Sequence, residues 1–199
     1  MTKNLSLSVS PTEALNVLNG KQTALLRKRV PKGYVGWCYG VVSKGKPYLN
    51  KEDVGNKYFL VNGVKYMGYE VLNSKIPFRF WYEEVETYYL ERPLNLEITY
   101  RGIDNQQGCE YSKDIKKELL KKTNLTFSEL FDLGHKRFDG QQSVINLISI
   151  TKLEVFDKPM ELGNFNRMYI SRTMDNVKTG LMLTLTKSPS TYQYVWVKE

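Results

Sequence analysis

A strand that passes directly into a capped helix constrains the fold of this chain more than any other feature. Over residues 5–10, Leu and Val alternate with Ser, a period-two pattern that predicts a strand with one buried face. Residues 10–13 then read Ser-Pro-Thr-Glu, a capping box with its proline at the first helical position. The sequence therefore predicts a helix over residues 11–19 that ends at Gly20 in a left-handed conformation.

The rest of the chain is predicted to be mostly strand. A strand over residues 22–30 follows the helix at once, which makes the first thirty residues a β-α-β unit. Two further helices are predicted, one over residues 113–122 and one from the capping box at Thr126 to Leu133, where Gly134 ends it. The polar residues 87–111 are predicted to be a long connection with one strand at 94–100. The remaining predicted strands cover residues 34–42, 57–60, 64–72, 78–82, 144–155, 180–186 and 192–197.

Composition narrows the class of protein. The 199 residues are 41% hydrophobic, enough for one domain with its own core, and the net charge of +8 favours acidic partners such as a phosphate backbone. We expect a cytoplasmic protein that does not enter a membrane, because no apolar run approaches the roughly 20 residues that span a bilayer and the N-terminus lacks a signal-peptide core. Cys38 and Cys109 lie too far apart for a CxxC pair and are expected to be free thiols.

Five strings, spread in order over nearly the whole chain, resemble the ASCH family of the PUA-like superfamily, in the form found in phage and prophage members. The family's opening strand, helix, Gly turn and basic strand end are similar to residues 5–31. The other four strings are residues 35–49, VGWCYGVVSKGKPYL; 119–133, LLKKTNLTFSELFDL; 149–165, SITKLEVFDKPMELGNF; and 186–197, TKSPSTYQYVWV.

The resemblance implies an α+β fold in which a PUA-like, mostly antiparallel β-barrel carries several flanking helices. It implies a single domain over residues 1–199 with an insertion around residues 87–140. Proteins of this architecture generally bind RNA or another nucleic acid, and a few members hydrolyse modified nucleosides. Since a fold does not determine a function, each activity has to be weighed on the residues themselves.

The residues argue against the hydrolase activity. In the amidohydrolase members a lysine two positions after the glycine and a threonine three positions further carry the chemistry. Gln22 and Leu25 occupy those places here, and neither is a base or a nucleophile. Lys21 and Thr23 are adjacent, but a shift of one residue on a strand turns a side chain to the opposite face. The sequence therefore predicts no catalytic residue.

No cofactor or metal is expected either. His135 is the only histidine and follows Gly134, where a histidine commonly contacts the last carbonyls of a helix. A lone histidine with two distant cysteines does not make a zinc site. The carboxylates at residues 83–86 are typical of a solvated face, and no glycine-rich phosphate motif is present.

The cations after Gly20 are the strongest candidate for binding. On an extended strand Arg27 and Arg29 share one face about 7 Å apart, close to the spacing of successive phosphates, and the guanidinium fork suits an oxyanion. Lys21, Lys28 and Lys32 add to this positive charge. Two alternatives remain open: Arg27 forms a buried pair with a carboxylate from residues 83–86, or the lysines and Arg29 are solvated strand-end charges.

The closing segment supplies a second group of candidates. Tyr192, Tyr194 and Trp196 alternate near Lys187, and aromatic faces beside cations suit unpaired bases, although such a stripe is more often one wall of a core. We expect two of the three to pack in the core and Tyr192 to be exposed.

These residues predict a protein that binds nucleic acid, RNA in particular, in a cleft between the Gly20 turn and the loop from Lys187 to Tyr192. The alternatives are a hydrolase acting on RNA or a modified nucleoside in that cleft, and a protein-binding accessory or inhibitor factor.

Overall fold

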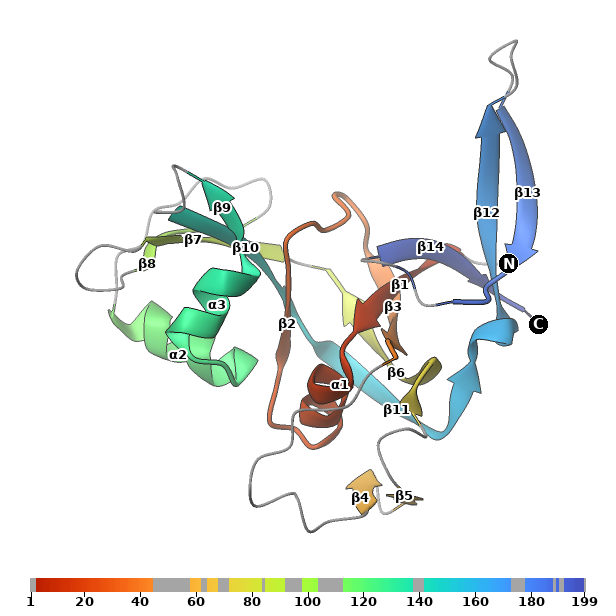
Figure 1. The fold of residues 1–199 in the computed structure, drawn as a ribbon, viewed down its shortest axis with the longest axis horizontal. Helices are drawn as coiled ribbons and strands as arrows, with labels where there is room; N and C mark the ends of the chain where they lie inside the picture. Colours follow the sequence, from red (N-terminus) through yellow and green to blue (C-terminus); the bar gives the residue numbers. More distant parts are fainter. Residues whose placement is uncertain are drawn as a thin grey trace. The chain divides into compact units, whose positions relative to one another are not determined.

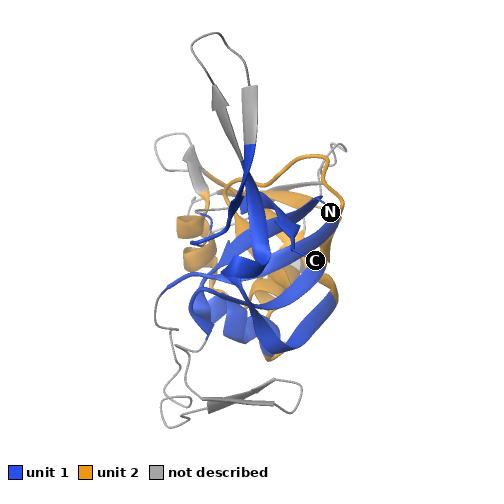
Figure 2. Ribbon diagram, turned by 90° about the vertical axis from the view of Figure 1, so that its right-hand side faces the viewer, with its two compact units in different colours: residues 1–18, 36–80, 153–199 blue, residues 19–35, 81–152 orange. Residues whose placement is uncertain are grey.

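The computed structural model describes residues 3–44, 58–61, 64–67, 72–83, 85–91, 98–103, 113–137, 142–172, 178–187, 189 and 192–198. The described chain divides into two compact units, which Figure 2 distinguishes by colour. Unit 1 comprises residues 1–18, 36–80 and 153–199, and unit 2 comprises residues 19–35 and 81–152. The predicted insertion at 87–140 lies within unit 2.

Most strands of unit 1 belong to a seven-stranded sheet with the order β11-β6-β3-β1-β14-β12-β13. Strands β1 and β3 are parallel, and β14 is antiparallel to β1. The helix α1 packs on β3, and a short 3-10 helix, η2, joins β11 to β12. The bounds are β1 Lys3–Val9, α1 Pro11–Leu18, β3 Gly36–Val42, β6 Lys75–Tyr82, β11 Thr151–Glu161, η2 Leu162–Asn164, β12 Phe165–Arg172, β13 Lys178–Thr184 and β14 Tyr192–Val197. Unit 1 also contains a separate pair, β4 Tyr58–Val61 and β5 Val64–Met67.

The opening β-α pattern is confirmed. The capping box forms as predicted: the Ser10 backbone N–H donates to Glu13 Oε2 at 2.9 Å, and the Glu13 N–H donates to Ser10 Oγ at 3.2 Å. Gly20 has a φ of +68°, the left-handed conformation expected at the end of this helix. The leucines of β1 are fully buried, and so are Ala14 and Val17 of α1.

Unit 2 is built on a second sheet with the order β2-β10-β7-β8, and β9 pairs with β10 at its side. Helices α2 and α3 cover one face, where they share a core with β2, β7 and β10 (Figure 1). The bounds are β2 Ala24–Arg27, β7 Val85–Glu91, β8 Ile98–Ile103, α2 Lys113–Thr123, α3 Phe127–Leu133, β9 His135–Arg137 and β10 Gln142–Ser149.

The fold class is α+β, as expected, but the two sheets are not closed into the barrel that the resemblance implied. The strand predicted over residues 144–155 is two strands that belong to different sheets, β10 and β11, separated at Ile150. Lys152, next to this break, has a φ of +46°, a conformation that bends the chain. None of the described helices has the length and apolar content needed to cross a bilayer.

The region predicted to be a polar connection is the other main difference. Residues 87–111 carry most of β7 and all of β8, which pair antiparallel from Glu86 opposite Ile103 to Leu90 opposite Ile98. A bulge between Tyr89 and Leu90 interrupts the register. Such a bulge breaks the strict alternation on which strand prediction depends. Cys109 lies outside the described residues, and Cys38 is buried in β3.

The capping box predicted at the start of α3 is confirmed. The hydroxyl of Thr126 accepts from the Glu129 backbone N–H at 3.3 Å, and the Thr126 N–H donates to Glu129 Oε2 at 2.7 Å. The pKa of the Glu129 carboxyl is held below its ordinary 4.5 by two hydrogen bonds. The larger cause is the bond from the Thr126 backbone N–H, and the second is the bond from the Thr126 hydroxyl. The cap therefore stabilises α3 fully above this ordinary pKa, and its charged contribution is lost as the pH falls through the lower folded value.

We expect Thr126→Ala to lower the free energy of unfolding by about 1 kcal/mol at neutral pH, because it removes the acceptor for an unpaired helix N–H. Urea denaturation at pH 7 and at pH 3 measures this change. The loss should shrink at the lower pH, and Ser128→Ala, at an exposed position of the same helix, is the control. An equal loss at both pH values would contradict a charged cap.

Gly134 ends α3 for a reason other than the expected one. Its φ is −72°, so it is not left-handed. A side chain at this position would overlap the hydroxyl of Ser143. That hydroxyl is buried and donates to the carbonyl of Phe131 at 2.8 Å, which satisfies one of the last carbonyls of the helix. His135 begins β9 opposite Val144 instead of ending the helix.

Candidate nucleic-acid interface

The cationic segment leaves the sheet at the end of β2. Lys28, Arg29 and Lys32 are exposed and Arg27 is half-buried, with its Nη1 donating to the carbonyl of Leu26 at 2.5 Å. The observed strand β2 is shorter than the predicted strand over residues 22–30. It ends at Arg27, so Arg29 lies beyond it. The prediction that Arg27 and Arg29 lie on one strand is therefore wrong, and the prediction that their guanidiniums project together stays a prediction. What remains is a basic segment that begins at a strand end.

Neighbouring strands hold the start of this segment. The Cα of Arg27 lies opposite Asn146 of β10. The Asn146 side-chain amide Nδ2 donates to the carbonyls of Arg27, at 3.1 Å, and Lys28, at 3.2 Å. Its Oδ1 accepts from Thr87 Oγ1 on β7 at 2.9 Å. A polar row across three strands thus fixes the backbone from which the cations project.

The far end of the segment is fixed as well. Pro31 is buried, and its carbonyl accepts from the hydroxyl of Tyr82 at 2.8 Å. Tyr34 packs on the same tyrosine, with ring centroids 5.7 Å apart. Gly33, with a φ of +66°, makes the turn between Pro31 and Tyr34. Hydrogen bonds to Asn146 and Tyr82 hold the two ends of the basic segment. Its backbone therefore loses little conformational freedom when the cations bind an anion.

The apolar residues of β2 are buried on both faces. Ala24 and Leu26 contribute to the core beneath the helices, as the alternation predicts. Leu25 points to the other face and is also fully buried, opposite Ile148. The predicted open face of this strand therefore begins only at Arg27.

The positions that carry the chemistry in the amidohydrolases are structural in this chain. Gln22 is buried, and its Nε2 donates to the carbonyl of Ala24 at 2.8 Å. Leu25 has no exposed surface. Lys21 and Thr23, which precede them, are exposed.

The second group of predicted residues lies in the other unit. Lys187 is exposed and Tyr192 is half-buried in β14, opposite Leu7 of β1. The expectation that Tyr192 is the exposed aromatic and the other two pack in the core is wrong, because Tyr192, Tyr194 and Trp196 are all half-buried. Since Gly20 belongs to unit 2 and Lys187 to unit 1, the cleft between them stays a prediction.

The Tyr194 ring of β14 is already covered by a cation. Lys3 Nζ lies 3.8 Å from the ring centroid, a cation–π contact between neighbouring strands. A second such contact places the guanidinium of Arg79 4.2 Å from the ring centroid of Trp37. Arg79 Nε also donates to Glu154 at 2.7 Å, so its charge is compensated within unit 1.

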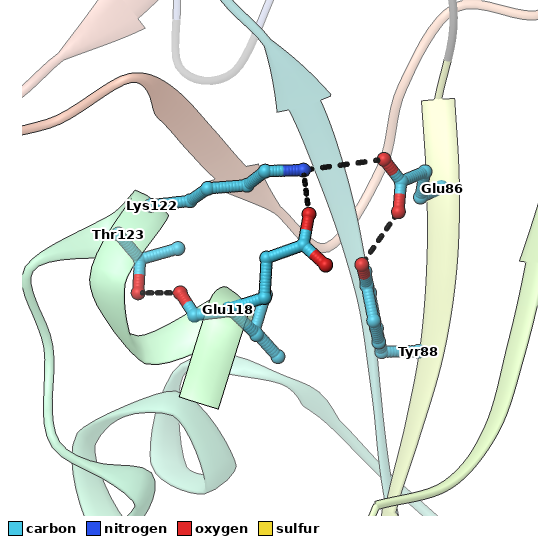
Figure 3. A network of polar contacts seen from close by, with 6 residues as sticks. Glu86, Tyr88, Glu118, Lys122 and Thr123 are labelled. Carbon is cyan, nitrogen blue, oxygen red and sulfur yellow. Dashed lines mark hydrogen bonds and ion pairs between the residues drawn. The ribbon is translucent and has the colours of Figure 1, made fainter. Parts of the chain in front are cut away.

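Unit 2 contains a buried carboxylate, Glu86, that the sequence did not lead us to predict. Glu86 on β7 lies under α2, where the hydroxyl of Tyr88 donates to its Oε2 at 2.5 Å (Figure 3). Lys122 of α2 reaches its Oε1 at 4.0 Å and pairs with Glu118 at 2.6 Å. These contacts tie α2 to the sheet. The signal was present in the alternation of Glu86, Tyr88 and Leu90, which places the glutamate on the face that the helices cover.

The carboxylates at 83–86 do not form the single solvated face that was expected, because Glu83 is exposed while Glu86 is buried. Glu84 lies outside the described residues. No group of three His, Cys, Asp or Glu side chains suited to a metal occurs in the part of the chain that the structure describes.

Comparison with known proteins finds no family model, no curated protein and no solved structure that matches this chain. The resemblance to the ASCH family therefore rests on the five sequence strings, and each functional role has to be argued from the residues.

Proposed function

We propose that the chain binds nucleic acid, RNA in particular, through the basic segment from Arg27 to Lys32. One observation carries this proposal. The segment is held at its start by Asn146 and at its end by Tyr82, and it exposes Lys28, Arg29 and Lys32 between and beside these anchors.

The distribution of charge supports an anionic ligand. Residues 19–35 contain five Lys or Arg and no Asp or Glu. The neighbouring strands contribute neutral polar groups: Asn146 and Thr87 bond to each other, and Asn146 bonds to the backbone of the segment. A fixed backbone with projecting cations suits a phosphate chain, whose charges recur at short intervals. RNA is preferred over duplex DNA because the resemblance implies a PUA-like ancestry, in which RNA is the usual ligand.

The finer proposal extends the site to the second unit. Lys187 is exposed and Tyr192 is half-buried in unit 1, and the PUA-like resemblance implies that both contact the same RNA. Tyr192 then offers a half-buried ring on which an unpaired base can stack, an interaction worth about 1–3 kcal/mol per base.

A salt titration tests the basic segment. Fluorescence anisotropy of a labelled single-stranded RNA is measured at several salt concentrations for the natural chain and for a Lys28→Ala/Arg29→Ala/Lys32→Ala variant. The affinity should fall by at least about tenfold at low salt, and the slope of log K against log salt should become less steep by about 2, or about 0.7 for each lost phosphate contact.

Because these three side chains are exposed, the variant is expected to fold, and circular dichroism checks this. Lys121→Ala, at an exposed cation of α2 in the same unit, is the matched control and should change the affinity little. An affinity that does not depend on salt, or a slope that the triple variant leaves unchanged, would refute the assignment. A Tyr192→Ala variant that binds RNA as tightly as the natural chain would refute only the extension to the second unit.

A further inference from the structure

The strands β12 and β13 form a two-stranded ribbon at the end of the unit 1 sheet (Figure 1). They pair with each other from Asn166 opposite Thr184 to Arg172 opposite Lys178. Among the described residues, β12 pairs with β14 only at Phe165 and Asn166. The ribbon beyond Asn166 therefore has no third strand in the described part of the chain, and β13 is the end strand over its whole length.

The ribbon is apolar where a free ribbon should be polar. Met168, Leu181, Met182 and Leu183 are exposed by 46%, 60%, 44% and 39%, and they make up four of the seven large hydrophobic side chains that are exposed among the described residues. Leu181 and Leu183 lie on one face, and Met182 lies on the other beside Met168, its partner across the ribbon. An isolated two-stranded ribbon is marginally stable in water, so this apolar surface calls for a covering partner.

The two ends of the seven-stranded sheet are protected differently. The opposite end strand, β11, contains Lys152, Lys158 and Pro159, the residue types that prevent another strand from adding to an edge. In β13 one lysine, Lys178, stands at the first position, and residues 180–184 read Gly-Leu-Met-Leu-Thr and contain none of these residue types. The backbone edge of β13 is therefore open to an added strand over residues 180–184.

The positive charge of the ribbon indicates which kind of partner would bind it. Residues 165–187 contain four Lys or Arg and one acidic residue, Asp175. The excess of positive charge in this stretch suits an anionic partner. No carboxylate among the described residues pairs with Arg167 or Lys187. A second copy of this chain would bring the same positive ribbon and a net charge of +8, so self-association is opposed by repulsion.

We propose that the β13 edge binds an extended segment of another protein, in which acidic side chains alternate with apolar ones. The segment adds as a further strand: its backbone bonds to β13, its apolar side chains cover Leu181 and Leu183, and its carboxylates face the cations of the ribbon. RNA is not favoured as the occupant, because four exposed apolar side chains offer nothing to a phosphate chain. This docking surface is independent of the basic segment in unit 2.

A peptide-display selection tests the proposal with a defined probe. A library of random twelve-residue peptides is selected on the natural chain and counter-selected on a Leu181→Glu/Leu183→Glu variant. The recovered peptides should be rich in Asp and Glu alternating with Val, Ile or Leu. A synthetic copy of one recovered peptide should slow amide hydrogen exchange in β13 and should bind the variant at least about tenfold more weakly.

The controls separate this surface from the RNA site and from a loss of folding. Both leucines are exposed, so the variant should keep its melting temperature. Leu153→Glu, on the opposite edge at 40% exposure, should leave peptide binding unchanged, and so should the triple variant of the basic segment. The proposal is overturned if no peptide is recovered, if the recovered peptides are basic, or if sedimentation shows a dimer that the Leu181→Glu/Leu183→Glu change dissociates. It is also overturned if that change weakens RNA binding while peptide binding is absent.

Discussion

Phe78→Ala is expected to lower the free energy of unfolding by about 3–5 kcal/mol, the range measured when a large aromatic side chain is removed from a packed core. Phe78 is fully buried in β6 of unit 1 and lies beside Phe80, with ring centroids 6.5 Å apart. Its ring also lies against the backbone of Gly40 on β3, where a Cβ would come within 2.5 Å of the ring. The loss of stability therefore combines the lost transfer free energy of the buried ring with the cost of the cavity that it leaves.

The contact with Gly40 makes this prediction specific. Gly40→Ala alone should destabilise by about 1–3 kcal/mol, because the added methyl group would lie within 2.5 Å of the buried Phe78 ring. In the Phe78→Ala background the same methyl group enters the vacated space, so it should cost much less. A double-mutant cycle by urea denaturation measures this coupling. Gly163→Ala, where a Cβ would meet no atom within 4 Å, is the control. Additive losses would show that the two residues are not in contact.

Tyr88→Phe is expected to destabilise unit 2 by about 1–3 kcal/mol, although it removes one oxygen atom and leaves the ring in place. The hydroxyl is the donor to Glu86 Oε2, and Glu86 is only 8% exposed. A buried carboxylate that loses a hydrogen bond keeps its desolvation penalty without the compensating contact. Lys122 does not replace the lost bond, since it lies 4.0 Å from the other carboxylate oxygen.

Two further variants decide whether the effect arises from the buried carboxylate. Glu118→Gln removes only the exposed partner of Lys122 and should cost less than about 1 kcal/mol. Glu86→Leu/Tyr88→Phe replaces both buried partners with apolar groups and should be less destabilised than the sum of the single changes. Chemical denaturation followed by circular dichroism measures all of these variants. A Tyr88→Phe protein as stable as the natural chain would show that Glu86 is satisfied by other contacts.

Local signals in the sequence were sufficient for the helices and their ends. The capping boxes at Ser10 and Thr126 and the left-handed Gly20 need only residues within four positions of one another, so they form wherever the chain places them. The exposure of Lys28, Arg29 and Lys32 likewise follows from their long charged side chains. The net charge and the α+β class also required no knowledge of distant contacts.

Strand pairing, in contrast, was decided by residues far apart in the chain. At the end of β2 the carbonyls of Arg27 and Lys28 accept hydrogen bonds from the side chain of Asn146, which is 119 positions away from Arg27. Leu25 is fully buried, although it lies on the face predicted to be open. Alternation reports which side chains share a face but not what covers that face or which strands pair, and this is why the pairing of β8 with β7, the division between β10 and β11, and the burial of Leu25 required the tertiary structure.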